Sequence, residues 1–119
     1  MHVLLKSSES IGVDSQTNFP AVATLFAPGV GFKWRIAGWR ASFSGAAVGV
    51  GLRVTVVGLK AVTIARGVDS SDAWEVNLTS PMDGADNGAV SITIPPGGVG
   101  AVGDVSIWGY RVSILLTDG

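Results

Sequence analysis

Residues 32–43 read FKWRIAGWRASF, and this stretch decides the fold class. In its first half, three large apolar residues alternate with two cationic ones, and in its second half large apolar residues again occupy every other position. A period of two places successive side chains on opposite faces of a β-strand, so one face of this strand is expected to be buried. We therefore interpret residues 32–43 as one long strand with an apolar inner face.

The phase of this alternation changes at Gly38. The apolar residues before Gly38 share one face, whereas Trp39 and the apolar residues after it fall on the other face. One inserted residue near Gly38, a β-bulge, would return both sets to the same core, and glycine is a common bulge residue. The alternative is that Trp39 faces outward, onto a partner or solvent.

Similar alternation recurs along the chain, interrupted at short intervals by Gly and Pro, and no segment keeps a helical period. The pattern predicts eight strands, at residues 2–6, 21–26, 32–43, 48–56, 62–67, 74–78, 90–94 and 108–116. We expect an all-β fold, an antiparallel β-sandwich of jelly-roll type whose long final strand pairs in mid-sheet with the first. An up-and-down barrel is the alternative. No repeat or linker is visible, so residues 1–119 are expected to form a single domain.

The composition restricts the classes of function. The 119 residues contain no Cys, and their net charge is −1. Disulfides, thiolate metal sites and Cys nucleophiles are therefore excluded, and the near-neutral charge argues against a nucleic-acid partner. Charged residues make up only 14% of the chain, against about 25% in ordinary domains. This predicts that another chain covers part of the surface.

No segment is expected to enter a membrane. The apolar run at the N-terminus is too short for a signal peptide, and the weakly charged residues 41–52 fall short of the ~20 apolar residues that a membrane-spanning helix needs. We expect a protein that is made in the cytoplasm of its host and has no membrane partner.

Residues suited to catalysis are sparse. His2, the only His, stands at the terminus, so no Ser-His-Asp arrangement is expected. We predict no enzymatic activity, no catalytic residues and no cofactor. The loop that contains Asp83, Asp86 and Asn87 offers the oxygen ligands that Ca²⁺ prefers, but it lacks the Asp-x-Asp-x-Asp spacing of a calcium loop. A plain surface loop is the preferred interpretation, and no metal is predicted.

Two segments are candidates for contact with a neighbouring subunit. Residues 7–28 begin with a polar stretch, residues 7–18, and end in apolar residues, so they form either a connector across the sandwich or an extended arm. Residues 95–104 are glycine-rich without the ending of a phosphate loop, and they predict a long mobile loop whose apolar residues need cover. The predicted interface residues are Phe19, Val22, Leu25, Phe26, Val99 and Val102.

Arginines and tryptophans are interleaved on the predicted strands. Such a surface can stack on single-stranded nucleic acid or on sugar. The net charge of −1 and the lack of a basic run favour instead arginines that cover aromatic faces at edges or interfaces. A carbohydrate-binding β-sandwich, or the receptor-binding tip of a phage fibre, remains the alternative function, with Trp39 or Trp108 as the stacking platform.

Two runs of sequence resemble those of a known class of proteins. Residues 32–47, FKWRIAGWRASFSGAA, and residues 50–56, VGLRVTV, resemble a pattern in small structural proteins of tailed bacteriophages. In that pattern, a W-R-I-x-G-x-R-A-S strand leads through Ser-Gly-Ala to a partner strand of alternating Val and Leu. The resemblance covers roughly residues 31–57 and, more loosely, residues 89–116. It carries no distinctive binding motif over to particular residues.

The resemblance implies a capsid decoration (cement) protein or minor capsid protein. Such proteins are compact β-sandwiches, often trimeric, that clamp neighbouring subunits of the major capsid protein on the surface of the virion. This role requires no covalent bond to be made or broken. Apolar area buried between subunits stabilises the complex by about 25 cal/mol per Å² before the costs of association. Many copies on one lattice also make a weak single contact sufficient.

Overall fold

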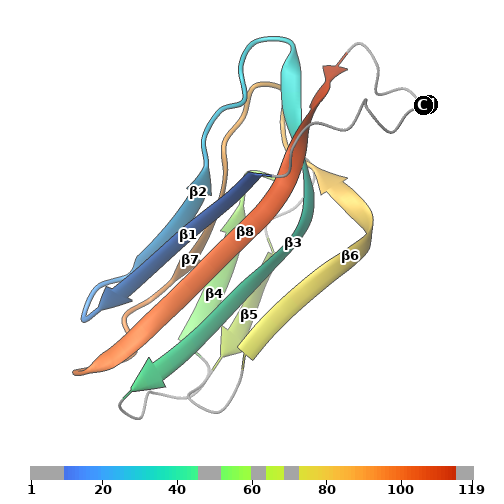
Figure 1. The fold of residues 1–119 in the computed structure, drawn as a ribbon. Helices are drawn as coiled ribbons and strands as arrows, with labels where there is room; N and C mark the ends of the chain where they lie inside the picture. Colours follow the sequence, from blue (N-terminus) through green and yellow to red (C-terminus); the bar gives the residue numbers. More distant parts are fainter. Residues whose placement is uncertain (1–9, 46–51, 60–63, 69–72, 115–119) are drawn as a thin grey trace.

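The computed structural model describes residues 10–45, 52–59, 64–68 and 73–114 (Figure 1). Within these ranges the chain forms eight β-strands. Their bounds are β1 Ser10–Thr17, β2 Ala21–Leu25, β3 Phe32–Gly45, β4 Leu52–Val57, β5 Ile64–Val68, β6 Ala73–Asp83, β7 Val90–Ile94 and β8 Ala101–Ser113.

The strands form two antiparallel sheets that pack face to face as a sandwich (Figure 1). One sheet has the order β1-β8-β3-β6 and the other the order β2-β7-β4-β5. The pairs β1·β8, β2·β7, β3·β6 and β4·β5 are nested, as in a long hairpin folded onto itself, which is the arrangement of a jelly roll. The predicted sandwich is therefore confirmed, and the up-and-down barrel is wrong because most consecutive strands lie in different sheets. The final strand, β8, lies in mid-sheet as predicted.

The β-bulge predicted near Gly38 is confirmed. The register of β3 shifts between Ile36 and Gly38 against both neighbouring strands. The shift returns Trp39 to the inner face, where its side chain is 2% exposed. The bulge also requires glycine, since a Cβ at residue 38 would collide with the Val76 carbonyl oxygen and lie 2.6 Å from Cζ2 of Trp108.

The core lies between the two sheets and contains the inward side chains of both. They come from seven of the strands and the β4–β5 connection. The largest fully buried side chains are Trp39, Ile36, Ile92, Ile94, Ile107, Val54, Val56 and Val90. Trp39 and Trp74 pack edge to face, with ring centroids 5.7 Å apart.

The polar connector expected at residues 7–18 is wrong over most of its length. Ser10–Thr17 form β1, which pairs with β8 from Ser10 opposite Gly109 to Thr17 opposite Val102. The inward positions of β1 are small or polar because this strand packs closely on the backbone of β2, which leaves little room for large apolar side chains. The strand expected at residues 2–6 lies outside the described residues.

The long loop expected at residues 95–104 is also shorter than predicted, because β8 begins at Ala101. Gly103 faces inward, and side chains from other strands fill its place: Cγ2 of Ile94 and Cε1 of Phe43 lie 3.0 and 3.5 Å from where its Cβ would be. A glycine-rich sequence thus forms an ordered strand since its neighbours supply the missing volume.

Candidate interaction surfaces

The edge formed by β1 and β2 is the first candidate surface. Both are end strands of their sheets, and they lie side by side (Figure 1). Oδ2 of Asp14 accepts a hydrogen bond of 2.9 Å from the Val22 N–H, and a Cβ on Gly12 would lie 2.8 Å from the Thr24 carbonyl oxygen. The two strands therefore close against each other where end strands would ordinarily offer a template for pairing. A partner has to bind this edge mainly through side chains.

Charge is nearly absent from the β1–β2 region. Residues 10–31 contain one charged side chain, that of Asp14. Its carboxylate is already engaged, because it also accepts a hydrogen bond of 3.1 Å from Nε2 of Gln16. The bonds from the Val22 N–H and from Gln16 lower the pKa of Asp14 below its ordinary value. This region is therefore weakly ionic, as the composition of the whole chain predicted.

Large apolar side chains are exposed on the same region, and we call this set the apolar edge. Its members lie on β1, on β2 and in the loops that follow each of them. They are Ile11, Val13, Phe19, Val22, Phe26 and Val30. Side chains of β1 and β2 leave opposite outer faces of the sandwich, so the apolar edge wraps around the molecule instead of forming one flat patch.

The β2–β3 loop, which carries Phe26 and Val30, is anchored from three directions. Nε1 of Trp34 donates a hydrogen bond of 2.8 Å to the Phe26 carbonyl. Oδ1 of Asn87 accepts one of 2.9 Å from the Gly29 N–H, and an Arg111 guanidinium N–H donates one of 3.3 Å to the Pro28 carbonyl. These bonds fix the main chain, so the exposed side chains of the loop are presented in a defined position.

The predicted interface residues differ in how far the structure exposes them. Phe19, Val22, Phe26 and Val99 are exposed, and Val102 is half-buried on β8 opposite Thr17. Phe19 and Val99 project from two loops that are joined by a hydrogen bond of 3.2 Å from the Gly100 N–H to Oδ1 of Asn18.

Leu25 was a wrong choice as an interface residue. Its side chain is 4% exposed and belongs to the core, because the alternation of β2 directs Ala21, Ala23 and Leu25 inward. Conversely, Ile11 and Val13 were missed, although their alternation with polar residues in SIGVDSQT is the signal that could have found them.

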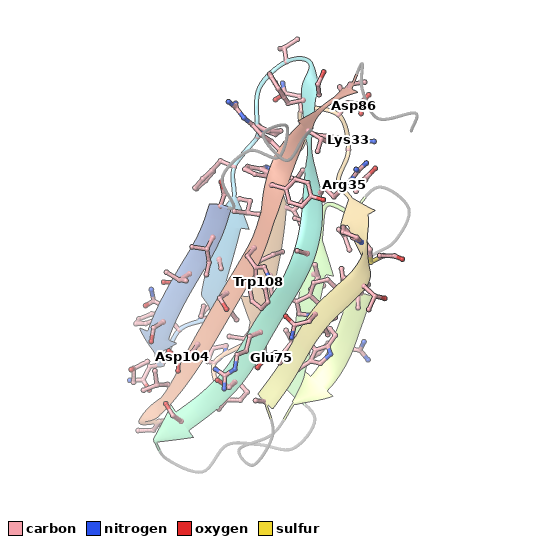
Figure 2. All side chains as sticks on the ribbon, turned by 45° about the vertical axis from the view of Figure 1, so that its right-hand side comes forward. Lys33, Arg35, Glu75, Asp86, Asp104 and Trp108 are labelled. Atoms are coloured by element: carbon pink, nitrogen blue, oxygen red, sulfur yellow. The ribbon has the colours of Figure 1, made fainter. Side chains whose placement is uncertain are left out.

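The outer face of the β1-β8-β3-β6 sheet is the second candidate surface. Trp108 lies near the middle of this face (Figure 2). It pairs in register with Ile11 on β1 and with Gly38 on β3, and its side chain is half-buried. Of the two tryptophans predicted as a stacking platform, Trp108 is accessible. Trp39 is not, because the bulge places it in the core.

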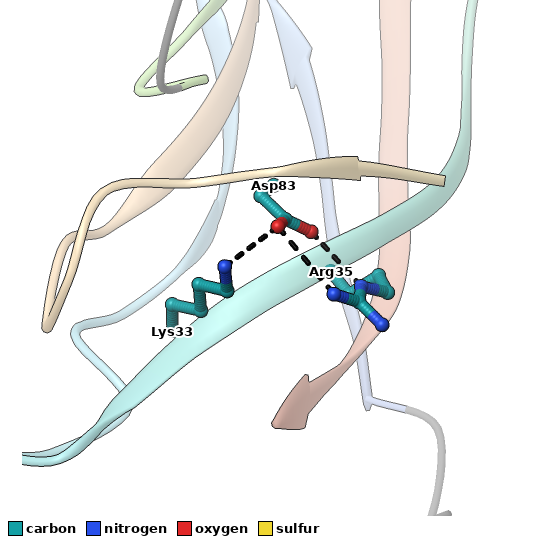
Figure 3. A network of polar contacts seen from close by, with 3 residues as sticks. All are labelled: Lys33, Arg35 and Asp83. Atoms are coloured by element: carbon teal, nitrogen blue, oxygen red, sulfur yellow. Dashed lines mark hydrogen bonds and ion pairs between the residues drawn. The ribbon is translucent and has the colours of Figure 1, made fainter. Parts of the chain in front are cut away.

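Ion pairs flank Trp108 on the same face. One side has the pair of Arg40 Nε and Glu75 Oε1, 3.3 Å apart, and both of these side chains are well exposed. On the other side, Asp83 is held between two cations: its Oδ2 lies 2.7 Å from Lys33 Nζ, and its Oδ1 lies 2.9 Å from Arg35 Nε (Figure 3). The carboxylate raises the pKa of Arg35, which also has Tyr110 as a hydrogen-bond partner.

The oxygen ligands considered for Ca²⁺ are used within the fold. The Asp83 carboxylate is paired with Lys33 and Arg35, and the Asn87 side chain binds the Gly29 N–H. Asn87 also donates its own N–H to the Phe32 carbonyl at 2.7 Å, with a φ of 52°. In the part of the chain that the structure describes, no group of three or more His, Cys, Asp or Glu is placed to hold a metal. The loop instead secures the turn between β2 and β3.

Acid is expected to destabilise the fold through Asp83. Burial raises the pKa of this carboxyl, but the hydrogen bonds and positive charges of Arg35 and Lys33 outweigh burial and hold the pKa below its ordinary value. The ion pairs therefore stabilise the fold fully above the pKa of an Asp carboxyl in the unfolded chain, about 4. Their contribution is lost as the pH falls through the lower pKa of Asp83 in the folded chain. Melting temperatures measured from pH 6 to pH 2 should fall more steeply for the unmodified chain than for Asp83→Asn. Parallel curves would contradict the assignment.

The chain matches no protein-family model and no curated protein sequence. Among solved structures it is similar to a ruminal GH26 endo-β-1,4-mannanase, with 13% identity and a TM-score of 0.35 over 77% of this chain, and it spans 18% of that enzyme. It is also similar to TmCBM61, solved in complex with β-1,4-galactotriose (9% identity, TM-score 0.41, 90% of this chain and 89% of that one). A third is the C-terminal domain of a structural protein from Sulfolobus turreted icosahedral virus (10% identity, TM-score 0.36, 86% of this chain and 92% of that one).

At these identities and TM-scores the likeness concerns the fold alone and carries no argument about function. By its own strand order and register, the chain is an all-β jelly-roll sandwich. No helix in the described ranges is long and apolar enough to cross a membrane.

Proposed function

We propose that the chain is a virion structural protein, a decoration protein that stabilises a phage head by binding major capsid subunits through the apolar edge. It has no catalytic function. The observation that carries the proposal is the coincidence, in residues 10–31, of exposed large apolar side chains with a single, internally bonded charge. Protein interfaces are depleted of charged residues at their centre and enriched in aromatic ones, and Phe19 and Phe26 match that composition.

The energetic argument supports a role as a docking surface. Burying one exposed Val or Phe side chain is favourable by about 1.5–3 kcal/mol. Loops that must be ordered on binding would consume part of this gain. Here the hydrogen bonds to the Phe26 carbonyl and the Gly29 N–H order the loop before binding. Less of the free energy of burying its side chains is therefore lost to ordering the loop.

The proposed assembly is a homo-oligomer, most simply a trimer, on the outside of the capsid. Because the apolar edge wraps around both outer faces, one subunit can contact two neighbours, as a clamp between capsid subunits requires. Each contact can be individually weak, since many copies are bound to one lattice.

The test is binding of the purified chain to phage heads assembled without it, followed by cosedimentation, with light scattering for its own oligomeric state. Phe26→Asp is expected to reduce head binding at least tenfold, because a charge is placed in a buried apolar contact. The Trp34 bond is made to the Phe26 carbonyl and does not depend on the replaced side chain.

Val57→Asp is the matched control, since Val57 is an exposed Val on β4, outside the apolar edge. It is expected to bind heads as the unmodified chain does. A chain that stays monomeric and binds no heads would overturn the proposal, and so would equal losses in both variants.

A further inference from the structure

We infer that the outer face of the β1-β8-β3-β6 sheet binds an uncharged carbohydrate chain, with Trp108 as the surface on which a sugar ring stacks. The site adjoins the apolar edge at Ile11, which pairs in register with Trp108, but its polar groups lie outside that edge. The inference goes beyond the proposed role in the capsid. Four features of the face carry it: the seat of Trp108, the charge balance, the placement of hydrogen-bonding groups, and the direction of β8.

The first feature is the way the Trp108 indole packs against the sheet at Gly38. Cζ2 and Cε2 of Trp108 lie 2.6 and 2.8 Å from the position that a Cβ on Gly38 would take, so the ring occupies the space left by the missing side chain. Glycine at the bulge thus allows a tryptophan to lie close against the sheet. The ring is held by β3 on this side, yet its side chain is only half-buried. A seated and partly exposed aromatic ring is ready for stacking without a large loss of conformational freedom.

The second feature is the charge balance of the face. Strand alternation and register place six described charged side chains on it, three cationic and three anionic. They are Lys33, Arg35, Arg40, Glu75, Asp83 and Asp104. A face with no net charge gives no electrostatic preference for a phosphate backbone or for an acidic polymer. The occupant that suits it is uncharged.

The third feature is the placement of polar groups around the ring. The Arg40–Glu75 pair and Ser106, which is opposite Arg40, lie on one side of Trp108 along the strands. Tyr110, opposite Arg35, lies on the other side. Sugar rings combine an apolar C–H face with hydroxyl groups around the rim, so they need an aromatic ring with donors and acceptors beside it. Protein partners instead require a continuous apolar centre. Along the strands, polar groups interrupt such a centre on both sides of Trp108, whereas across the sheet the ring adjoins Ile11 on one side and Gly38 on the other.

The fourth feature is the direction of β8. Ser106, Trp108 and Tyr110 leave the same face at intervals of about 7 Å along the strand. This interval is longer than the advance of one hexose in a linear chain, so the stretch from Ser106 to Tyr110 spans more than two sugar units. A linear chain of sugars that follows β8 would place one unit on Trp108 and its neighbours beside Ser106 and Tyr110. We therefore infer a linear glycan of at least three units as the ligand.

Tryptophan fluorescence tests the inference directly. The other three tryptophans of the chain, Trp34, Trp39 and Trp74, are buried, so a change of emission on binding reports on Trp108. The probes are uncharged linear oligosaccharides of three to six hexoses, differing in sugar and linkage and titrated one at a time. At least one is expected to shift the emission saturably, and an acidic oligosaccharide of equal length is expected to bind no more tightly than its uncharged counterpart.

Two variants locate the site. Trp108→Ala is expected to weaken binding of the best oligosaccharide at least tenfold in calorimetry, and Arg40→Ala at least threefold, while Val57→Asp and Phe26→Asp bind it unchanged. Arg40 is exposed, so its replacement leaves the fold intact even if Trp108→Ala proves unstable. The inference is overturned if no uncharged probe binds, or if Arg40→Ala binds as tightly as the unmodified chain.

A second copy of the chain is the competing occupant of this face. If Arg40→Ala and Trp108→Ala dissociate an oligomer in sedimentation velocity without changing sugar binding, the face is a contact between copies and the inference is wrong. Because Phe26→Asp tests head binding on its own, loss of one function leaves the test of the other intact.

Discussion

Replacing Gly109 by alanine is expected to lower the free energy of unfolding by about 3 kcal/mol or more, a large part of the stability of a small domain. Gly109 lies opposite Ile36, where the bulge of β3 begins. A Cβ there would collide with the Arg35 carbonyl oxygen and lie 3.0 Å from Cα of Ile36. These are main-chain atoms, so no rotamer change relieves the overlap. The two strands would have to separate at the bulge that places Trp39 in the core.

Gly103→Ala is the matched control for Gly109→Ala, because Gly103 also faces inward from β8. Its nearest neighbours are side-chain atoms, Cγ2 of Ile94 at 3.0 Å and Cε1 of Phe43 at 3.5 Å, which can move. The expected cost is about 1 kcal/mol. Urea denaturation of both variants measures the difference. Equal losses would mean that the close approach of β3 and β8 at Gly109 is not tight.

Replacing Asp83 by asparagine is expected to be the second large effect, a loss of about 2–3 kcal/mol. The carboxylate neutralises Lys33, whose side chain is only 9% exposed, and also binds Arg35. Asparagine keeps the size but leaves the Lys33 ammonium almost buried without its counter-charge. The figure stays below that of a fully buried pair because Asp83 and Arg35 are each about a quarter exposed.

Glu75→Gln provides the comparison for Asp83→Asn. Glu75 pairs with Arg40, but both side chains are about half exposed, so water screens the pair and the expected loss is within about 0.5 kcal/mol. Lys33→Met combined with Asp83→Asn should recover part of the stability, since the buried charge is then removed. Chemical denaturation at pH 7 measures all four chains. A double variant no more stable than Asp83→Asn would show that the ammonium is not what makes the single change costly.

Residues near the bulge show which features of the fold the local sequence can predict. The phase change at Gly38 was sufficient to predict a long strand and to favour an inserted residue, because alternation within a single strand reports which side chains share a face. Whether Trp39 is buried stayed open in the sequence, and the register shift decides it. The same rule predicted β2 and β7. Leu25 was predicted both within β2 and at the apolar end of residues 7–28, and the alternation of this strand directs its side chain into the core.

β1 and Asp83 show where local sequence fails. β1 lacks an apolar inner face, since Gly12 packs against the main chain of β2, and contacts between backbones leave no hydrophobic pattern. Asp83 lies in a loop-like sequence with Asp and Gly, and this composition suggests a turn or a cation site. Its real partners, Lys33 and Arg35, are some fifty positions away in the sequence.

The sequence by itself therefore determined the strands with one buried face, the bulge, the sandwich and the weakly charged character of the surface. These properties follow from periodicity and composition, which every short segment carries. Only the tertiary structure decided that β1 and β2 close on each other and leave an apolar edge, and that Trp108 rests on Gly38 between two sets of ion pairs. Those surfaces are built from strands distant in the chain, and their pairing is set by register across the sheets.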